Sequence, residues 1–381
     1  MGRRIQKLRR DERGMTLIFV GVGFIAFMAA TTLAIDVGMF MTARSQAQNA
    51  ADSGALAGAV ALGFDDFDDR SPNGPAVLSA INASLANAVM HDNVSVTPAD
   101  VTFPVGPSGN NRVRVTVRRT VERNNAVPTL IGPMFGVPTA DIMATATAEA
   151  APANAMTCVK PFIIPDKWIE SHSPPWSEDD TFEMFDNKGN PLPTQDVYIP
   201  ADQPGYTGYS DEYDRGRRIT IRAGSGNNIN PTFYYSLALG DETGGADYDW
   251  NIANCNTTIV RWGDIVIQEP GNMVGPTVSG AQELIARDPN AYWDTAQNTV
   301  VSDFHPSPRV FPIPLYDPIH YAEGKNNGRF ADFKVANYIG FFLESIVGNE
   351  IVGRVIPISG LAVGGAPAPN GAFPIAIRLV E

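Results

Sequence analysis

The residue types that most often carry out chemistry are sparse in this 381-residue chain. It has two cysteines and four histidines, with no recognisable motif that pairs a histidine with a thiol. The Gly-x-Ser-x-Gly, P-loop and His-Glu-x-x-His strings of common hydrolases, nucleotide-binding proteins and zinc proteases do not occur. We therefore expect a protein that is not an enzyme, with no catalytic or cofactor-binding residues, no cofactor and no small-molecule substrate.

Acidic clusters are the other candidate ligands. Carboxylates gather at Asp65–Asp69, Asp211–Asp214 and Asp241–Asp249, and in the run Asp186-Asn-Lys-Gly-Asn190. Their oxygens are of the kind that bind Ca²⁺, although none of these runs has EF-hand spacing. The alternative is that they are solvated acidic turns whose Asn and Gly residues set the backbone. We favour the turns, and so assign no metal ligand.

The N-terminal region contains a candidate membrane span. Residues 15–35 read MTLIFVGVGFIAFMAATTLAI, without a charge, which is close to the ~20 residues that cross a bilayer as a helix. Six basic side chains in the tail at residues 1–14 predict a cytoplasmic N-terminus, with everything after Asp36 outside. A cleaved signal peptide is the competing interpretation. It is disfavoured because the apolar run exceeds the usual ~7–15 residues and the helical pattern continues past it.

The rest of the chain is acidic. The whole sequence has 28 Lys and Arg against 41 Asp and Glu, a net charge of −13, although its tail is basic. A negative surface repels phosphate backbones, so we expect no nucleic-acid partner.

The helical pattern continues through residues 36–63 as a stalk without proline. Small residues recur there, and in the span, at every fourth position. The two series are Ala26, Ala30, Ala34, Gly38 and Ala43, Ala47, Ala51, Ala55, Ala59. Each follows a slanted ridge along which another helix could approach closely. The alternative is that alanine is simply the best helix former. The first series is our candidate helix-packing site.

A specific pattern begins where the helix leaves the span. From Ala34 to Ala59 the chain reads AIDVGMFMTARSQAQNAADSGALAGA. This resembles the N-terminal signature of TadG-like proteins of Flp/Tad pilus assembly, in which an Asp-x-Gly is followed by Gln-Asn-Ala-Ala-Asp-x-x-Ala-Leu-Ala-Gly-Ala. Asp36 begins the first part, and Gln48, Asn49 and Asp52 are polar members of the second. We expect Asp36 to be a structural anchor rather than an ion relay, because a charge at the end of a span is readily hydrated.

The resemblance implies a membrane-anchored structural or assembly component of a bacterial Flp/Tad, type IV-like, pilus or secretion apparatus. It implies an inner-membrane location, a periplasmic body and other Tad/Flp envelope or pilus components as partners. Two family features are missing: Phe19 stands where a prepilin-peptidase substrate cut at Gly14 would have Glu, and the Asp-x-Ser-x-Ser string of a von Willebrand factor A domain does not occur. The alternative function is a membrane-tethered, calcium-dependent adhesin or ligand-binding module.

The two cysteines bear on the same topology. An even pair outside the cytoplasm is expected to form a disulfide, so we expect Cys158 and Cys255 to join. Two buried free thiols are the alternative.

Residues 64–150 are expected to form a small α+β module, similar in plan to pilin-like proteins. Arg112–Arg118 alternates strictly between charged or polar and apolar residues, the pattern of a half-buried strand. The expected order is a helix at Pro75–Met90, paired strands at Val94–Val105 and Arg112–Arg118, a short helix at Ala126–Phe135 and a strand at Ala140–Ala150.

A linker at residues 151–156 precedes a region, 157–381, that holds every Trp, Tyr and Cys of the chain. We expect this region to be a mostly β domain with its own core. Its expected strands are Arg218–Ala223, Thr232–Leu239, Thr257–Trp262, Ile351–Ile358 and Phe373–Val380, and its expected helices are Gly280–Arg287 and Phe330–Val347. The predicted fold class is therefore α+β: a long N-terminal transmembrane and stalk helix, the small pilin-like module, and the mostly β C-terminal domain.

Overall fold

The computed structural model describes residues 12–107, 109–224, 228–240, 243–326, 332–364 and 368–380. The chain divides into two compact units, one made of Met1–Ala150 with Ile377–Glu381 and the other of Ala151–Ala376. The fold is mixed α+β, as expected, with a long N-terminal helix followed by a mostly β C-terminal region.

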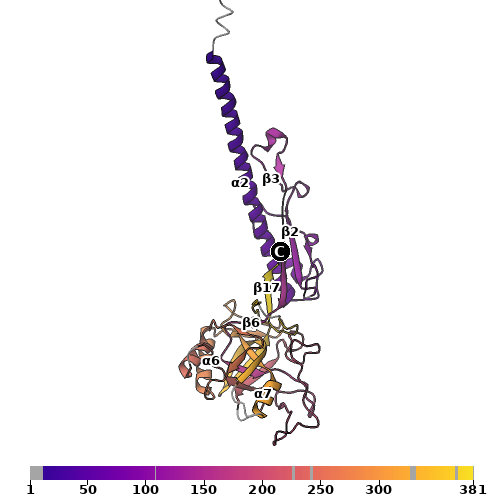
Figure 1. Ribbon diagram of the computed structural model, residues 1–381, viewed down its shortest axis with the longest axis vertical. Coiled ribbons are helices and arrows are strands. Elements are labelled where there is room, and N and C mark those ends of the chain that lie inside the picture. The colour runs from indigo at the N-terminus through magenta and orange to yellow at the C-terminus, as the bar shows by residue number, and fades with distance from the viewer. Residues whose placement is uncertain are drawn as a thin grey trace, which may run out of the picture. The chain divides into compact units, whose positions relative to one another are not determined.

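The first unit is organised around helix α2, Glu12–Phe64, which is unbroken over 53 residues (Figure 1). The first proline of the chain is Pro72, so nothing before it removes a backbone hydrogen bond. Past the helix end, Asp66 accepts the backbone N–H groups of Asp68 and Asp69 at 2.9 and 3.0 Å, which turns the chain away. The expected continuous span and stalk helix is therefore confirmed in the described residues.

The second small-residue series on α2 packs inside its own unit. Its members, Ala43, Ala47, Ala51, Ala55 and Ala59, are completely buried. They face helix α3, Pro75–Leu85, and strand β2, Arg112–Arg119. Helix α3 ends five residues before the expected Met90, which has a positive φ. This ridge lets α3 and the sheet approach α2 closely, so its small residues do more than favour helix.

Two glycines make that approach closest. A Cβ at Gly54 would lie 2.0 Å from the Ser84 hydroxyl and 2.9 Å from the Ala80 carbonyl oxygen, both on α3. A Cβ at Gly58 would lie 2.8 Å from Val113 of β2. Neither position has room for a side chain.

A four-stranded sheet covers the same face of α2, in the order β1-β2-β5-β17. The bounds are β1 Val101–Thr102, β5 Ile142–Pro152 and β17 Ile375–Leu379. The alternation predicted for β2 is confirmed, because Val113, Val115 and Val117 are fully buried while their neighbours are less so. Its expected partner, Val94–Val105, is confirmed only in part: Val101 pairs with Val115 in the antiparallel register, but β1 has two residues and Pro98–Asp100 before it forms η1.

The remaining short elements of this unit are η1 Pro98–Asp100, η2 Val121–Arg123, β3 Val127–Pro128, η3 Gly132–Phe135 and β4 Thr139–Ala140. The expected helix at Ala126–Phe135 is therefore wrong in its first half, where β3 pairs with β4. Pro128 and Pro133 supply no N–H and prevent a longer helix.

The C-terminal strand belongs partly to the first unit, although we expected it in the β domain. Strand β17 lies beside β5, and Val380 donates its N–H to the Thr147 carbonyl at 2.8 Å. Arg378 pairs with the buried Glu149 at 2.6 Å. The expected linker at 151–156 is also not free, because β5 runs to Pro152 and β6, Ala155–Met156, pairs with β10, Val260–Arg261.

The second unit is built on a closed barrel. A seven-stranded sheet runs β11-β15-β14-β7-β9-β8-β16, and β15 also pairs with β16, so six strands close on themselves. The strands are β7 Phe162–Pro165, β8 Arg218–Ala223, β9 Phe233–Ser236, β11 Ile265–Ile267, β14 Val310–Tyr316, β15 Asp332–Val347 and β16 Glu350–Ile356. A separate hairpin joins β12, Tyr292–Asp294, to β13, Thr299–Val301. Closure leaves β11 outside the barrel, as an extra strand on β15.

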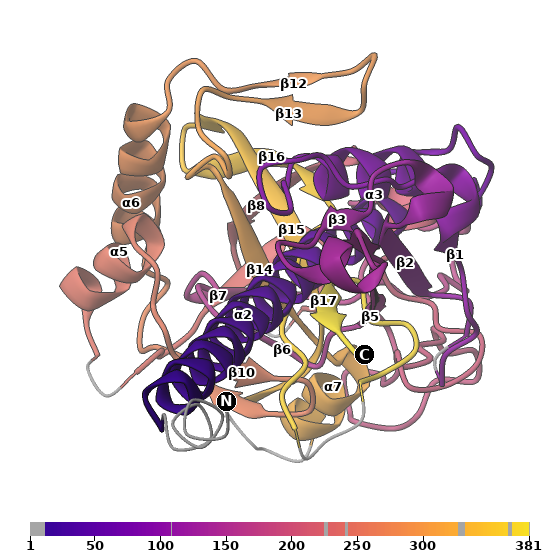
Figure 2. The ribbon, with the colours of Figure 1, turned by 90° about the horizontal axis from the view of Figure 1, so that it is seen from above.

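Two cores hold this unit together. The first core draws apolar side chains from all six barrel strands and therefore fills the barrel. It also includes residues of helices α5, Gly245–Ala253, and α6, Val274–Arg287. These two helices pack on each other (Figure 2). The other is aromatic and includes Tyr235, Tyr316, Phe333 and Tyr321 of helix α7, Pro318–Asn326. A short helix, α4, spans Asp211–Asp214.

The helix expected at Phe330–Val347 is wrong, because Asp332–Val347 is the long strand β15. Nine consecutive residues of it, from Val335 to Leu343, are buried, so the polar-apolar alternation that usually marks a strand is missing. Both neighbours, β14 and β16, pair with it along its length. Tertiary pairing therefore decides its conformation.

The packing of α2 predicts that replacing glycine by alanine has opposite effects on stability at Gly54 and at Gly38. Gly54→Ala should lower the free energy of unfolding by on the order of 1 kcal/mol, because overpacking costs about 1–3 kcal/mol. Gly38→Ala should raise it by about 0.5–1 kcal/mol, since nothing lies within 4 Å of a Cβ there and alanine favours helix. Thermal unfolding of both full-length variants in detergent micelles measures the difference. Equal shifts would contradict the close packing on α3.

Candidate functional site

The N-terminal part of α2 has no protein cover in the described chain. Every residue from Met15 to Ala30 is exposed, with Leu17 at 76% and Phe19 at 71%. Among the described residues, α2 is the one helix that is long and apolar enough to cross a membrane. An exposed apolar surface of this length needs a nonaqueous surrounding, which fits a membrane anchor. The basic tail, residues 1–14, lies outside the described side chains.

The first small-residue series lies on this exposed part. Ala26, Ala30, Ala34 and Gly38 are all exposed, and a Cβ at Gly38 would meet nothing within 4 Å. The two series on α2 therefore differ: the second is occupied by α3 and β2, whereas the first is open for most of its length. Its role in binding a partner stays a prediction.

Asp36 connects α2 to a distant loop. It is 5% exposed, and its two carboxylate oxygens accept the backbone N–H groups of Leu130 and Ile131 at 2.7 and 2.9 Å. We expected an anchor hydrated by water, but the structure replaces water with these two amides. A buried carboxylate is stable when backbone N–H groups solvate it. The anchor therefore fixes the loop after β3 to the helix at the end of the span.

The other polar signature residues take different positions. Gln48 donates to Asp52 at 2.9 Å and to the Thr145 carbonyl of β5 at 3.2 Å. Asn49 is exposed. Gln46, which is not one of the predicted signature residues, accepts the Met90 N–H at 2.8 Å. The structure thus brings Gln48 and Asp52 together against the sheet and leaves Asn49 on the surface.

An apolar cavity next to Asp36 was missed by the sequence analysis. It has a volume of about 380 Å³ and lies between α2 and the β3–β4 hairpin. Its lining includes Ala29, Ala30, Leu33, Ile131 and Val137. The signal in the sequence that could have indicated it is the run without charge from Asn124 to Ala140.

The acidic runs are engaged in their own turns and pairs. Asp186 accepts two N–H groups of its turn at 2.8 and 2.9 Å, in the same way as Asp66. Asp214 is buried and pairs with Lys167 at 2.8 Å. In the run at 241–249, residues 241 and 242 lie outside the described residues. These contacts support the structural interpretation of the described carboxylates.

A second acidic group was also missed. Ligand atoms of Glu170, His172 and Asp196 lie within 4.8 Å of one another, a set that could hold a metal ion. However, Glu170 already accepts the backbone N–H groups of His172 and Ser173, and Asp196 accepts those of Ser171 and Glu183. The carboxylates therefore order this loop, and we assign them no ligand.

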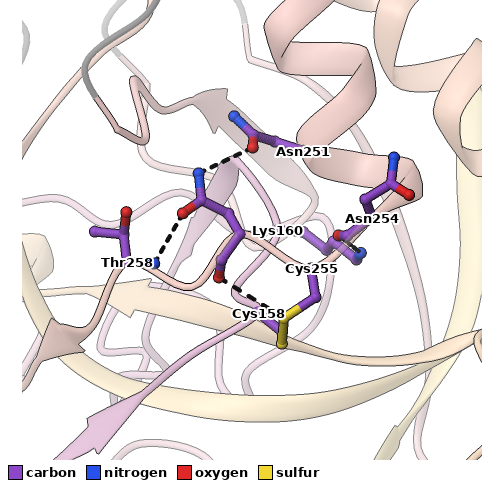
Figure 3. The surroundings of a disulfide bond; sticks show 7 residues. Cys158, Lys160, Asn251, Asn254, Cys255 and Thr258 are labelled. Carbon is purple, nitrogen blue, oxygen red and sulfur yellow. Dashed lines mark hydrogen bonds between the residues drawn. A yellow bond between two sulfur atoms is a disulfide. The ribbon is translucent and has the colours of Figure 1, made fainter.

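Cys158 and Cys255 are joined by a disulfide, with Cα atoms 4.3 Å apart (Figure 3). The Cys158 N–H donates to the Asn256 carbonyl at 2.9 Å. Nearby, Lys160 donates to the Asn254 carbonyl at 2.9 Å, and burial, aided by the charge of Arg287, lowers the pKa of Lys160 to about 7. The disulfide crosslinks segments 97 residues apart, and neither sulfur is a free nucleophile.

Residues 14–61 match the family model described as "Putative Flp pilus-assembly TadE/G-like". The match confirms the TadG-like resemblance, and it covers most of α2: the exposed apolar part, Asp36 and the buried ridge. No curated protein and no solved structure matches the chain. The match supports a component of pilus assembly and leaves the specific role to be proposed.

The Asp36 anchor predicts that the loop after β3 is held by one carboxylate. Asp36→Ala should leave the Leu130 and Ile131 amides without acceptors, and their hydrogen exchange should accelerate on the order of tenfold or more. Hydrogen–deuterium exchange with mass spectrometry of peptides from this loop measures the effect. Asn49→Ala, at an exposed site on the same helix, is the control and should change nothing. Unchanged protection in Asp36→Ala would show that the loop is held by other contacts.

Proposed function

We propose that this protein is a membrane-anchored structural or assembly component of a bacterial Flp/Tad pilus or secretion apparatus, and that it is not an enzyme. One observation carries the proposal: the segment that matches the pilus-assembly family is a single helix with an exposed apolar part and a packed part. Such a helix joins a membrane to a folded body. The described residues give the alternative, a calcium-dependent adhesin, no specific support.

The proposed location is the inner membrane, crossed once, with the N-terminus in the cytoplasm and both folded units in the periplasm. Two observations support this orientation. The basic residues precede the span, as the positive-inside rule requires of a cytoplasmic end. The Cys158–Cys255 disulfide lies in the part placed outside, where oxidising conditions preserve such bonds.

The proposed mechanism is helix packing in the membrane together with protein contacts in the periplasm. Helices in lipid gain little from the hydrophobic effect, so they associate through close van der Waals contact along small residues. The exposed series from Ala26 to Gly38 offers such a surface, whereas its neighbours Phe27 and Met28 are bulky. The proposed partners are other Tad/Flp envelope or pilus components.

The orientation predicts where the C-terminus lies. A reporter enzyme that is active only outside the cytoplasm, fused to the C-terminus, should be active at normal expression. The same fusion with Arg3, Arg4, Lys7, Arg9, Arg10 and Arg13 replaced by Gln should lose part of that activity, because the tail then resists translocation less. An inactive reporter on the unaltered chain would reverse the assignment of both units.

The exposed ridge predicts a position-dependent effect of bulk. Ala26→Leu with Ala34→Leu should keep the span apolar and helical, since leucine ranks close to alanine in helix propensity. Crosslinking to partner proteins in the native envelope and pilus assembly should fall several-fold, because leucine prevents close approach. Ala30 is left unchanged because it lines the cavity beside the hairpin.

The matched control is Phe27→Leu with Met28→Leu, which changes neighbouring positions of α2 without adding bulk to the ridge. Crosslinking and assembly should then stay at the level of the unaltered protein. If both double variants behave like the unaltered chain at equal protein level, the ridge binds no partner and its alanines serve only the helix.

A further inference from the structure

The β3–η3–β4 hairpin is an apolar element that the proposed function does not use. The chain from Asn124 to Ala140 carries no charge. Three of its apolar side chains are more than half exposed: Leu130 at 59%, Met134 at 83% and Val137, which also lines the cavity, at 52%. In Figure 1 this hairpin lies alongside α2, and Asp36 binds it there. Isolated exposed apolar side chains are ordinary, but three on one short charge-free hairpin need an explanation.

The depth of the hairpin relative to the expected membrane span follows from its contacts with α2. The cavity between them is lined on the helix from Ala29 to Phe40, with Ala29, Ala30 and Leu33 on the N-terminal side of Asp36. Ala29 lies seven residues before Asp36, which is about 10 Å along a helix that rises 1.5 Å per residue. The hairpin therefore runs beside the last two turns of the expected span, on the membrane side of Asp36.

The length of the span then decides where the membrane surface lies. The hydrocarbon core is about 30 Å thick and needs about 20 helical residues. If the membrane surface lay on the N-terminal side of the hairpin, the part of α2 inside the membrane would be only Met15–Met28, about 14 residues or about 21 Å of helix. The span cannot extend the other way, because Glu12 and Arg13 precede it. The full thickness is reached only if the helix beside the hairpin is also in the membrane.

We infer that the β3–η3–β4 hairpin inserts into the outer half of the membrane beside α2, and that lipid acyl chains occupy the apolar cavity between them. This inference depends on the proposed membrane anchorage. Lipid is the occupant because the cavity opens on the surface of a helix that is itself surrounded by lipid, so the two apolar surfaces are continuous. A second copy of the chain, or another protein helix, is the competing occupant.

The backbone of the hairpin is suited to that surrounding. An unpaired N–H in hydrocarbon costs several kcal/mol, so irregular backbone enters a membrane only where its polar groups are satisfied. Thr129 donates to Pro138 and Val137 to Gly132, at 3.0 and 2.8 Å, and Met134 and Gly136 donate to carbonyls of the same turn. The Leu130 and Ile131 amides go to Asp36, and the prolines at 128, 133 and 138 have no N–H. The Asp36 carboxylate is shielded in the same contact, which is how charges at this depth are tolerated.

The experiment places a fluorophore at Met134 and asks whether lipid touches it. Full-length Met134→Cys is labelled with an environment-sensitive dye and reconstituted into phosphatidylethanolamine and phosphatidylglycerol vesicles. The native cysteines are in a disulfide, so only the new thiol reacts. Nitroxide groups on the lipid acyl chains should quench the dye by more than half, and its emission should shift to the blue.

Two other labelled positions make the result unambiguous. Ile25→Cys, in the span, should be quenched. Leu78→Cys, a half-exposed apolar site on α3, should not be quenched, because α3 packs on α2 near Gly58, about 30 Å beyond Asp36. Quenching at Ile25 with none at Met134 would overturn the hairpin inference and leave the anchor standing. No quenching at either would contradict the anchor itself. A blue-shifted dye at Met134 that lipid does not quench would mean that protein, not lipid, covers the hairpin, which also overturns the inference.

Discussion

The constraint behind this structure is that one unbroken helix, α2, has two parts with opposite surroundings: an exposed apolar part and a part packed inside its own unit. From Met15 to Ala30 every residue is exposed and none is charged, as a lipid surrounding would require. From Ala43 to Ala59 a buried ridge of alanines, with Gly54 and Gly58 beside it, brings α3 and β2 into close contact. The change occurs within a few turns without a proline or a break. Continuous helix therefore joins the exposed part to the packed part.

Asp36 lies where the two surroundings meet, and its contact explains why the signature includes an acidic residue there. A buried carboxylate is costly unless its charge is solvated, and the Leu130 and Ile131 amides provide that solvation. The same two hydrogen bonds hold the apolar hairpin against the helix. One side chain thus ties the end of the exposed apolar part of α2 to a loop 94 residues away in the sequence.

The second unit is stabilised in a different way, by the closure of its strands into a barrel. Six strands close through the β15–β16 pairing, their common core fills the barrel, and the disulfide crosslinks segments 97 residues apart. A closed barrel leaves few free strand edges to pair with other chains. The family match ends at residue 61, before this unit begins. We therefore derive the proposed function from the first unit, while the barrel is a candidate surface for periplasmic protein contacts.

The sequence alone determined the features that depend on neighbouring residues. The charge-free run, the unbroken helix, the alternation of β2 and the TadG-like signature are all local patterns, and each was predicted with its residues. Only the tertiary structure decided the rest. It placed β15 as a strand where we expected a helix, because burial on both faces removes the alternation that would identify one. In the tertiary structure β17 joins the sheet of the first unit, where Arg378 pairs with Glu149, and Asp36 accepts the backbone N–H groups of residues 130 and 131. These contacts join residues separated by 94 or more positions, and no spacing along the chain specifies which distant backbone will solvate a buried charge.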